Sequence, residues 1–332
     1  MKKALVCGAG GFIAGNLALY FTKKGFTRIR AVDKKPLYEW YLHTPGVENL
    51  CLDVSHEENC QRVCEGAVEV YNLAADMGGM GFIERFRVEC LRSVLINTHM
   101  IEAAYRAGAR RYFFSSSACA YNILLQQDSN VRALKESDAY PAMAERGYGW
   151  EKLISEMFCQ EYWCERGMKT AIARFHNVYG PNGTWDGGRE KAPAAICRKT
   201  IEALDKNDPR ITIWGDGTPT RSFMYIDDCV KGIDMIMHCD ALIATPINLG
   251  SHELVSVNEL VSKVEKIAGV KLKRHYDPTG PRGVAGRNSD NTFIQQVLKW
   301  EPNTTLDKGL AVTYKWIKEQ YHRRKEGKRV VE

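Results

Sequence analysis

Two side chains four residues apart give the first indication of chemistry. Tyr148 and Lys152 bound the segment YGWEK, and on a helix residues at this spacing share one face. A free tyrosine has a pKa of about 10 and is a poor base at neutral pH, but we expect the nearby ammonium to lower that pKa by favouring the phenolate. Such a pair can take the proton of a hydroxyl group while a hydride leaves for an acceptor. The motif is common by chance and needs support from its surroundings.

A glycine-rich segment near the start of the chain indicates what that acceptor is. The segment GAGGFIA at 8–14 follows a predicted strand at 3–7 and opens a predicted helix at 13–24. Gly8 permits a tight turn, Gly11 lets the backbone approach a pyrophosphate at the helix N-terminus, and Ala14 lets the helix pack on the sheet. We therefore expect a bound dinucleotide, and its contacts here would be Gly8, Gly11, Phe12 and Ile13.

An acidic residue ends the next predicted strand, at 29–33. Asp33 lies 22 residues after Gly11, where a carboxylate can accept hydrogen bonds from the adenine ribose. The same carboxylate would repel a 2′-phosphate, so the expected cofactor is NAD rather than NADP. Lys34 and Lys35 follow directly and keep NADP open as an alternative.

A serine-rich strand end supplies two further candidates. The segment SSSAC at 115–119 ends a predicted strand that begins at Arg111, and ligands of doubly wound sheets lie beyond the carboxyl ends of the strands. If the extended geometry continues, Ser117 and Cys119 project to the same side. Ser117 could then hydrogen-bond the reacting hydroxyl beside Tyr148, and Cys119 could add a second acid–base group. The alternative for Cys119 is a small buried core residue, the commoner fate of cysteine.

The segments that must position these residues alternate between strand and helix patterns. Strands are predicted at 3–7, 29–33, 49–53, 68–73, 111–115, 170–175 and 246–249, and helices at 13–24, 57–64, 94–106, 148–166, 227–237 and 256–268. This order is typical of an α/β fold with a doubly wound parallel (Rossmann) sheet. The less regular second half indicates a smaller mixed α/β C-terminal domain.

Composition limits the possible classes of protein. The chain has 332 residues, 45% apolar and 26% charged, as in an ordinary globular protein. Its net charge of +6 suits an anionic small ligand and is too weak to indicate nucleic acid. Eleven cysteines without a C-x-x-C pair or a histidine cluster indicate free thiols and no metal site, so we expect a reducing, cytoplasmic location. No stretch approaches the 18 or so apolar residues of a membrane span.

Longer segments resemble one family across nearly the whole chain. They are 74–82 (AADMGGMGF), 116–119 (SSAC), 174–181 (RFHNVYGP), 188–195 (GREKAPAA), 220–223 (TRSF) and 286–291 (GRNSDN). Together with the cofactor motifs, they resemble the extended short-chain dehydrogenase/reductase family, and within it enzymes that act on a GDP-linked hexose.

The resemblance implies NAD-dependent epimerisation of GDP-D-mannose at C3 and C5, giving GDP-L-galactose, GDP-L-gulose or both. Tyr148, assisted by Lys152, would remove the proton of the C4 hydroxyl as hydride passes to NAD⁺, and the resulting ketone would acidify the hydrogens on C3 and C5. Cys119 and Lys191 would then act as an acid–base pair on opposite faces of the sugar before NADH reduces C4. A thiol suits this role because positive charge readily lowers its pKa from about 8.5. Without the resemblance, Lys191 would be interpreted as a surface lysine.

The resemblance also implies the remaining contacts. The substrate would touch Gly78, Ser117, Cys119, Asn177, Glu190, Lys191, Lys199, Arg221 and Arg287. The cofactor would also touch Asp53, Val54, Ala74, Tyr148 and Lys152. Arginine forks suit a diphosphate, although ion pairs within the protein are the alternative for Arg221 and Arg287.

The same resemblance implies a homodimer and two domains. An NAD-binding domain would span 1–175 and be re-entered at about 227–250, and a nucleotide-sugar-binding domain would combine 176–226 with 251–332. The pattern is broken after Cys119, where YNILL at 121–125 replaces a Tyr-Pro-Glu-like continuation and is expected to border the sugar.

Three other functions remain as alternatives. A nucleotide-sugar 4-epimerase needs only Tyr148, Lys152 and Ser117, and would leave Cys119 and Lys191 idle. A 4,6-dehydratase would carry an Asp-Glu pair where Ala118-Cys119 stands. A redox-sensing NAD-binding regulator without turnover would not need the intact tyrosine–lysine pair.

Overall fold

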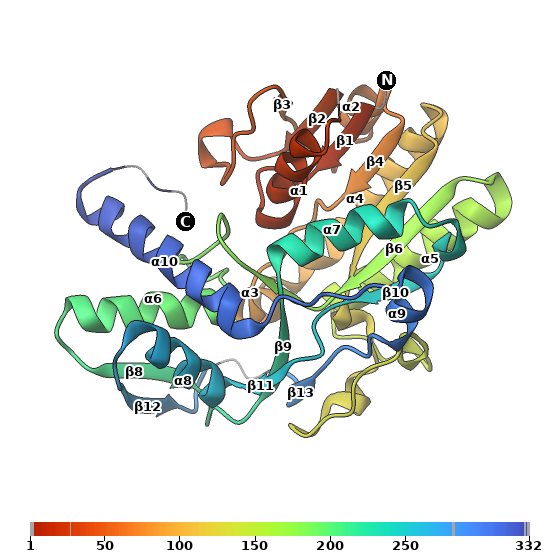
Figure 1. Ribbon diagram of the computed structural model, residues 1–332. Coiled ribbons are helices and arrows are strands. Elements are labelled where there is room, and N and C mark those ends of the chain that lie inside the picture. The colour runs from red at the N-terminus through yellow and green to blue at the C-terminus, as the bar shows by residue number, and fades with distance from the viewer. Residues whose placement is uncertain (1–2, 27, 281–282, 329, 331–332) are drawn as a thin grey trace.

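The computed structural model describes residues 3–26, 28–280, 283–328 and 330. Its largest element is a seven-stranded sheet, in which every neighbouring pair of strands is parallel (Figure 1). The strand order is β10-β6-β5-β4-β1-β2-β3. The strands are β1 (Lys3–Cys7), β2 (Arg28–Asp33), β3 (Glu48–Cys51), β4 (Glu69–Asn72), β5 (Arg111–Ser117), β6 (Lys169–Phe175) and β10 (Pro246–Leu249). Apart from β10, this is the order of a dinucleotide-binding fold, so the predicted doubly wound sheet is confirmed.

Helices cover both faces of this sheet, because strands with two apolar faces must be buried on both sides. The alternation is visible in β1, where Ala4 and Val6 join one core cluster and Leu5 and Cys7 join another. Helices α1 (Phe12–Lys23) and α7 (Ile226–Met237) pack together over the first cluster. Helices α2 (Glu57–Cys64), α4 (Arg87–Arg106) and α5 (Tyr148–Arg166) pack side by side over the second.

The rest of the chain forms a smaller mixed α/β region. Figure 1 shows α6, α8 and α10 grouped with β8 and β12, away from the large sheet. The helices are α6 (Ala192–Asp205), α8 (Val257–Ala268), α9 (Thr292–Leu298) and α10 (Leu306–Lys325). The strands are β7 (Asn177–Tyr179), β8 (Arg210–Trp214), β9 (Thr220–Tyr225), β11 (Leu254–Ser256), β12 (Lys273–Asp277) and β13 (Gly286–Arg287). Between β9 and β11 the chain returns through α7 to β10, which pairs with β6.

Several predicted elements agree closely with the structure. The bounds of β1, β10, α2 and α5 are as predicted, and the Ser256–Glu259 capping box of α8 is present. Helix α4 begins at Arg87 and not at Val94. The sequence did not reveal its first two turns, because they expose the apolar Val88 and Leu91 and so lack a contrast between an apolar and a polar face. Helix α3 (Met80–Arg85), with only six residues, was not predicted.

The strand end that carries the candidate thiol differs from the prediction. Strand β5 stops at Ser117, and Ala118–Ala120 form a single 3-10 turn, so the alternation assumed for Ser117 and Cys119 was wrong. The cause is local: the Ser117 hydroxyl accepts a hydrogen bond from the Cys119 N–H at 3.1 Å, which closes the turn. No helix within the described ranges is long and apolar enough to cross a membrane.

The first turn of α5 packs against this 3-10 turn. A Cβ on Gly149 would overlap the Cys119 carbonyl oxygen and lie 3.0 Å from the Glu145 Cβ. The backbone N–H of Glu145 donates to the same carbonyl at 3.0 Å. Glycine at 149 therefore permits the close approach of α5 to the end of β5.

Substituting Gly149→Ala tests this packing. The new methyl group must displace backbone atoms, and we expect a loss of about 1–3 kcal/mol in the free energy of unfolding, together with loss of activity. Glu161→Ala, on the exposed side of the same helix, is the control and should change the unfolding free energy by less than about 0.5 kcal/mol. Urea denaturation followed by circular dichroism measures both. Equal stability of the two variants would contradict the close contact.

Candidate active site

A large cavity lies beyond the carboxyl ends of the parallel strands. Its volume is about 1040 Å³, and its lining extends from Asp33 at the end of β2 and Ser117 at the end of β5 to Trp214, Arg221 and Arg287 of the smaller region. Small-molecule sites usually measure about 300–1,000 Å³, so this cavity is large enough to hold an extended ligand or two adjacent ones.

The N-terminus of α1 forms one end of the cavity. Gly8 has φ +82°, and a Cβ there would lie 3.0 Å from the Leu73 carbonyl oxygen and from the Ala74 nitrogen. Gly11 caps the helix without a side-chain hydrogen bond, so the first N–H groups of α1 face the cavity beside Phe12. Such an exposed helix N-terminus favours phosphate oxygens. Of the predicted cofactor contacts, Gly8, Gly11, Phe12, Ile13, Asp33, Asp53, Val54, Ala74, Tyr148 and Lys152 all line the cavity.

Asp33 is fixed at the tip of β2. Its Oδ2 accepts from the Gly10 N–H at 3.1 Å and its Oδ1 from the Lys35 N–H at 2.9 Å. Burial raises the pKa of this carboxyl, and the two N–H groups oppose that rise. Lys34 pairs with Asp76 at 2.8 Å, and the Lys35 ammonium lies 5.0 Å from the Tyr41 ring centre. Both lysines therefore have partners within the protein, which weakens the NADP alternative.

Tyr148 and Lys152 lie on the buried side of α5. The Lys152 Nζ is 5.3 Å from the centre of the Tyr148 ring and 4.8 Å from the centre of the Phe114 ring. It also lies 3.4 Å from Oε2 of the neighbouring Glu151, and both of these side chains are buried. The predicted shared face is thus confirmed.

The predicted lowering of the Tyr148 pKa was wrong. Burial raises that pKa well above its usual value, and the Ser117 hydroxyl alongside acts in the opposite direction. After burial, Cys119 and Glu151 raise it further. The sequence pattern identified Tyr148 and Lys152 but not Glu151, whose carboxylate lies next to the lysine ammonium.

Cys119 lies against a buried guanidinium. Arg287 Nη1 is 3.2 Å from the Cys119 sulfur, Nη2 is 3.2 Å from Oε2 of Glu145, and Nε donates to Oε1 of Gln126 at 2.6 Å. Burial, then Glu145, raise the pKa of the thiol, and Arg287 opposes them. Cys119 is therefore both a buried residue and part of the cavity wall, next to a cation that can stabilise its thiolate.

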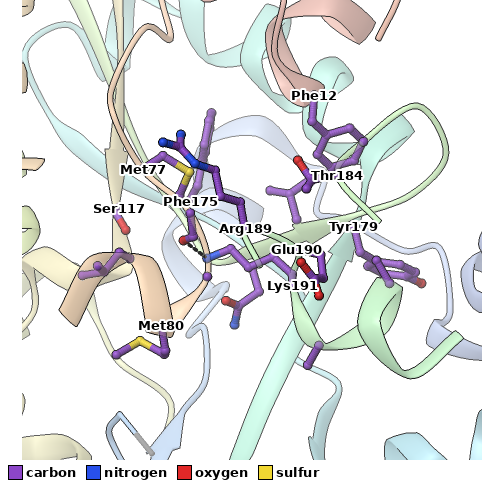
Figure 2. A pocket seen from close by; sticks show the side chains of 18 of the residues that line it. Phe12, Met77, Met80, Ser117, Phe175, Tyr179, Thr184, Arg189, Glu190 and Lys191 are labelled. Carbon is purple, nitrogen blue, oxygen red and sulfur yellow. Dashed lines mark hydrogen bonds between the residues drawn. The ribbon is translucent and has the colours of Figure 1, made fainter. Parts of the chain in front are cut away.

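Lys191 is in the cavity wall and not on the surface. It occupies the residue before α6, and its Nζ donates to the Gly78 carbonyl oxygen at 3.4 Å, the contact drawn in Figure 2. Burial lowers the pKa of the ammonium, and the Cys119 thiol interacts with it electrostatically in the opposite direction. Figure 2 shows Lys191 directed into the same space as Met77 and Ser117. The amine of Lys191 and the thiol of Cys119 thus line the same cavity.

The other predicted substrate contacts also line the cavity. Arg221 donates to the carbonyl oxygens of Thr220, Val284 and Ala285, and in the described part of the chain no carboxylate lies within ion-pair distance of it. Burial and the neighbouring Arg287 lower its pKa to about 10. The ion-pair alternative therefore holds for Arg287, through Glu145, but not for Arg221. The remaining predicted substrate contacts that line the cavity are Gly78, Asn177, Glu190 and Lys199.

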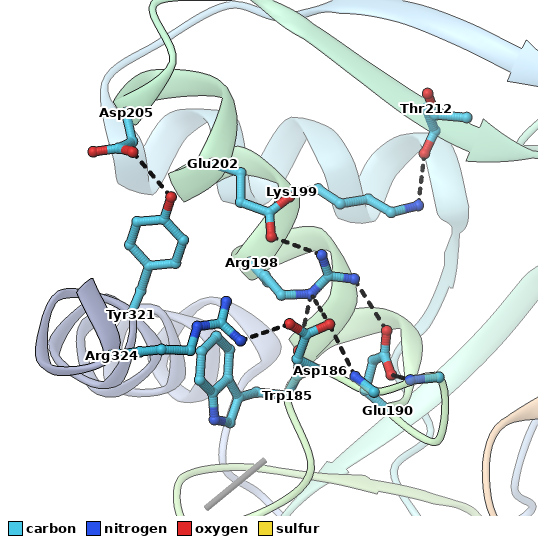
Figure 3. Close-up of polar contacts among 12 residues, drawn as sticks. Trp185, Asp186, Glu190, Arg198, Lys199, Glu202, Asp205, Thr212, Tyr321 and Arg324 are labelled. Carbon is cyan, nitrogen blue, oxygen red and sulfur yellow. Dashed lines mark hydrogen bonds and ion pairs between the residues drawn. The ribbon is translucent and has the colours of Figure 1, made fainter. Parts of the chain in front are cut away.

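A charge network fixes the loop that carries Glu190 and Lys191 (Figure 3). Arg198 of α6 contacts Asp186 at 3.2 Å, Glu190 at 3.1 Å and Glu202 at 2.8 Å. Arg324 of α10 reaches the same Asp186 at 2.8 Å. Glu190 is therefore paired within the protein, and its other oxygen accepts the Gly188 N–H at 2.7 Å.

Some residues of the site were not found from the sequence. Gln126 and Glu145 hold Arg287, but neither belongs to a recognisable motif. The segment at 121–125, expected to border the sugar, does not line the cavity within the described residues; Gln127 does. A local pattern could not have revealed these contacts, because Arg287 is more than 140 residues away from both partners.

Comparison with known proteins assigns the family. The profile described as "NAD dependent epimerase/dehydratase family" matches residues 4–250. The chain belongs to this family. Its sequence is 44% identical over 330 residues to GDP-mannose 3,5-epimerase of Arabidopsis thaliana, with 97% of this chain and 84% of the relative covered. GDP-mannose 3,5-epimerase 1 of Oryza sativa subsp. japonica is also 44% identical, over 324 residues, with 96% and 82% covered. The resemblance to extended short-chain dehydrogenases/reductases is confirmed.

Solved structures of two UDP-glucose 4-epimerases share the fold. A UDP-glucose 4-epimerase of Thermotoga maritima, solved with UDP-glucose, superposes with a TM-score of 0.85 at 22% identity, covering 96% of this chain and 99% of that one. A UDP-glucose 4-epimerase of Thermus thermophilus, solved with NAD, gives 0.81 at 18% identity, with 95% and 98% covered. At these identities the likeness concerns the fold alone.

The geometry of this chain fits the NAD of its family. A side chain on Gly8 would meet backbone, so the turn stays open to a ligand, and the uncapped start of α1 faces the cavity. Asp33 lines the cavity and follows the glycine motif at the spacing of the acidic residue that binds the adenine ribose in this fold. NAD is therefore the cofactor that these residues suit.

Proposed function

We propose that this protein epimerises GDP-mannose at C3 and C5. The observation that carries the proposal is the thiol of Cys119 and the amine of Lys191 in one cavity with the Tyr148–Lys152 pair. The names of the two plant relatives support the substrate and the reaction. GDP-L-galactose and GDP-L-gulose would be the products of inversion at both carbons and at C5.

The cofactor side of the cavity would hold NAD. We assign the pyrophosphate to the N-terminus of α1 at Gly11 and the adenine ribose to Asp33, with Asp53 and Val54 beside the adenine. When bound, NAD⁺ accepts the hydride of C4 and later returns it to the same carbon.

Tyr148 and Ser117 would handle the proton of the C4 hydroxyl. Tyr148 takes this proton as C4 is oxidised and returns it when C4 is reduced, while Ser117 orients the oxygen. To accept this proton, Tyr148 must be the phenolate, which its burial disfavours and the Lys152 ammonium, 5.3 Å from the ring centre, favours.

The ketone at C4 makes the hydrogens on C3 and C5 acidic, because each neighbouring carbanion is delocalised into the carbonyl group. One of Cys119 and Lys191 removes a proton as a base, and the other donates a proton to the opposite face of the same carbon. Each inversion consumes one proton and supplies one, so the sugar keeps its composition. Arg287 beside the sulfur stabilises the thiolate during this exchange.

Cationic side chains would bind the rest of the substrate. Arg221, with no carboxylate partner in the described ranges, suits the diphosphate. Arg287 and Lys199 add positive charge to the same cavity. We assign Gly78, Ser117 and Asn177 as uncharged contacts of the substrate, and Glu190 as a contact at its edge.

The proposal extends to the assembly and the setting of the protein. We assign cofactor binding to 1–175 with 227–250, and substrate binding to 176–226 with 251–332. The eleven cysteines are free in the structure, which supports a reducing location such as the cytoplasm.

We further propose a homodimer, because the adjacent helices α4 and α5 expose apolar side chains at helical spacing. These are Val88, Leu91 and Leu95 on α4 and Trp150, Ile154 and Met157 on α5.

Hydrogen exchange with solvent separates the proposed reaction from C4 epimerisation. In heavy water, GDP-mannose should gain deuterium at C3 and C5, as measured by proton NMR and mass spectrometry. Cys119→Ala should lower this exchange at least about 100-fold, the scale of a lost acid–base group, while oxidation at C4 continues. Cys229→Ala, at a buried thiol outside the cavity, is the control. Exchange at the wild-type rate in Cys119→Ala would contradict the role of the thiol, and the absence of deuterium at both carbons in the wild type would favour a 4-epimerase.

Tyr148→Phe removes the hydroxyl that receives the C4 proton. Rapid mixing with GDP-mannose should show the absorbance of reduced nicotinamide in the wild type and a rate lower by about 10²–10⁴-fold in the variant. Bound NAD content, determined after denaturation, checks that the site remains intact. Normal reduction of the cofactor in Tyr148→Phe would remove this residue from the mechanism.

A charge placed on the exposed face of α4 and α5 tests the dimer. Leu91→Glu puts an unpaired carboxylate into the proposed interface, and multi-angle light scattering should show a monomer where the wild type is a dimer. Leu124→Glu, at another exposed leucine, is the control. A wild-type monomer, or a dimer that Leu91→Glu leaves intact, would contradict the interface.

A further inference from the structure

One carboxylate beside the reacting groups has no part in the proposed reaction. Glu145 precedes α5, and its Oε2 lies 3.2 Å from Nη2 of Arg287, whose Nη1 lies 3.2 Å from the sulfur of Cys119. Among the described residues that line the cavity, Glu145 is absent, while Arg287 and Cys119 are present. The carboxylate therefore does not line the cavity, and it acts on the reacting groups through its charge and through the guanidinium.

Titratable and charged groups face the Cys119 thiol from every element packed around it. They are Arg287 of β13, Lys191 at the start of α6, Tyr148 of α5, Cys90 of α4 and Glu145 before α5. Arg221 of β9 adds a further positive charge next to Arg287 and Lys191. Glu145 is the carboxylate among these groups. Its charge therefore opposes that of the three surrounding cations.

Arg287 has a second anchor besides Glu145. Its Nε donates at 2.6 Å to Oε1 of Gln126, and the amide nitrogen of Gln126 donates in turn to the Asn122 carbonyl oxygen at 3.2 Å. Gln126 is completely buried. The guanidinium thus keeps a neutral anchor when the Glu145 charge is removed, and the effect of Glu145 on its surroundings is mainly electrostatic.

We propose that Glu145 is a positioning residue that sets, through Arg287, how readily Cys119 gives up its proton. A thiolate at Cys119 must share one guanidinium with the Glu145 carboxylate, so the carboxylate disfavours the thiolate and favours the ammonium of Lys191. The inference rests on the proposed function for the role of the thiol, but its charge geometry stands independently.

The directions of the pKa shifts agree with this arrangement. Burial raises the pKa of Cys119, Glu145 raises it further and Arg287 lowers it. For Lys191, burial lowers the pKa, whereas Cys119 and Glu145 raise it. Removing the Glu145 charge should therefore lower both pKa values, and the pH range in which the pair works should move to lower pH.

The test compares two variants that change the same guanidinium in different ways. Glu145→Gln keeps the shape and removes the charge, and Gln126→Ala removes the neutral anchor. Alkylation by iodoacetamide, followed at the Cys119 peptide by mass spectrometry across a pH series, reports the thiolate. We expect about tenfold faster alkylation in Glu145→Gln below the pH of thiol ionisation, which corresponds to about one pKa unit. Gln126→Ala, with a loosened Arg287, should alkylate more slowly, and Glu161→Gln on the exposed side of α5 should match the wild type.

The sign of the effect decides the proposal. If Glu145→Gln alkylates more slowly, as Gln126→Ala is expected to, Glu145 merely holds Arg287 in place and the proposal is wrong. An unchanged rate in Glu145→Gln overturns it as well. Deuterium exchange into GDP-mannose is measured separately on the same preparations. If Glu145→Gln is alkylated faster but the wild type incorporates no deuterium, the charge coupling is supported and the proposed function is wrong. If the wild type incorporates deuterium but Glu145→Gln is alkylated at an unchanged rate, the proposed function is supported and the charge coupling is wrong.

Discussion

The Cys119 carbonyl group is the point where the parallel sheet and the helix α5 meet. Gly149 packs against it without a Cβ, and the Glu145 N–H donates to it. These two contacts fix the start of α5 relative to the end of β5. Tyr148 therefore comes to lie beside Ser117 and Cys119, which belong to a different element. Larger side chains at 149 would separate the helix from the strand end, and with it the phenol from the thiol.

Around this junction the cavity has more positive than negative charge. Lys34 and Lys152 have carboxylates next to them, whereas Arg221 is held by backbone carbonyl oxygens and has its pKa lowered to about 10 by burial and by Arg287. Burying like charges together costs free energy in the unliganded protein. An anion bound between them recovers that cost, so a diphosphate would be bound more tightly than a neutral sugar. The mild net charge of the whole chain did not reveal this concentration of charge.

How far the sequence could predict the structure depended on whether the signal was local. The acid at Asp33 and the Tyr148–Lys152 spacing each belong to one or two neighbouring elements, and their positions in the structure agree with the predictions. The contacts that sequence reasoning missed join segments far apart in the chain. Glu145 meets Arg287 only because β13 is folded against the turn after β5, and no periodicity records such a meeting. The positions of the reacting groups therefore came from motifs and resemblance, whereas their electrostatic environment required the tertiary structure.

Fold alone does not separate the possible reactions of this family. The Thermotoga maritima 4-epimerase superposes well on this chain at only 22% identity, so the shared fold does not by itself determine the reaction. Oxidation at C4 is common to the 4-epimerase and the 3,5-epimerase reactions. The fate of the ketone then depends on whether a proton donor and acceptor stand beside the neighbouring carbons, and Cys119 and Lys191 stand in that cavity. A thiol that ionised freely would be a good base but a poor proton donor. The pairing of Arg287 with both Cys119 and Glu145 would keep the thiol between these extremes, which inversion at two carbons requires.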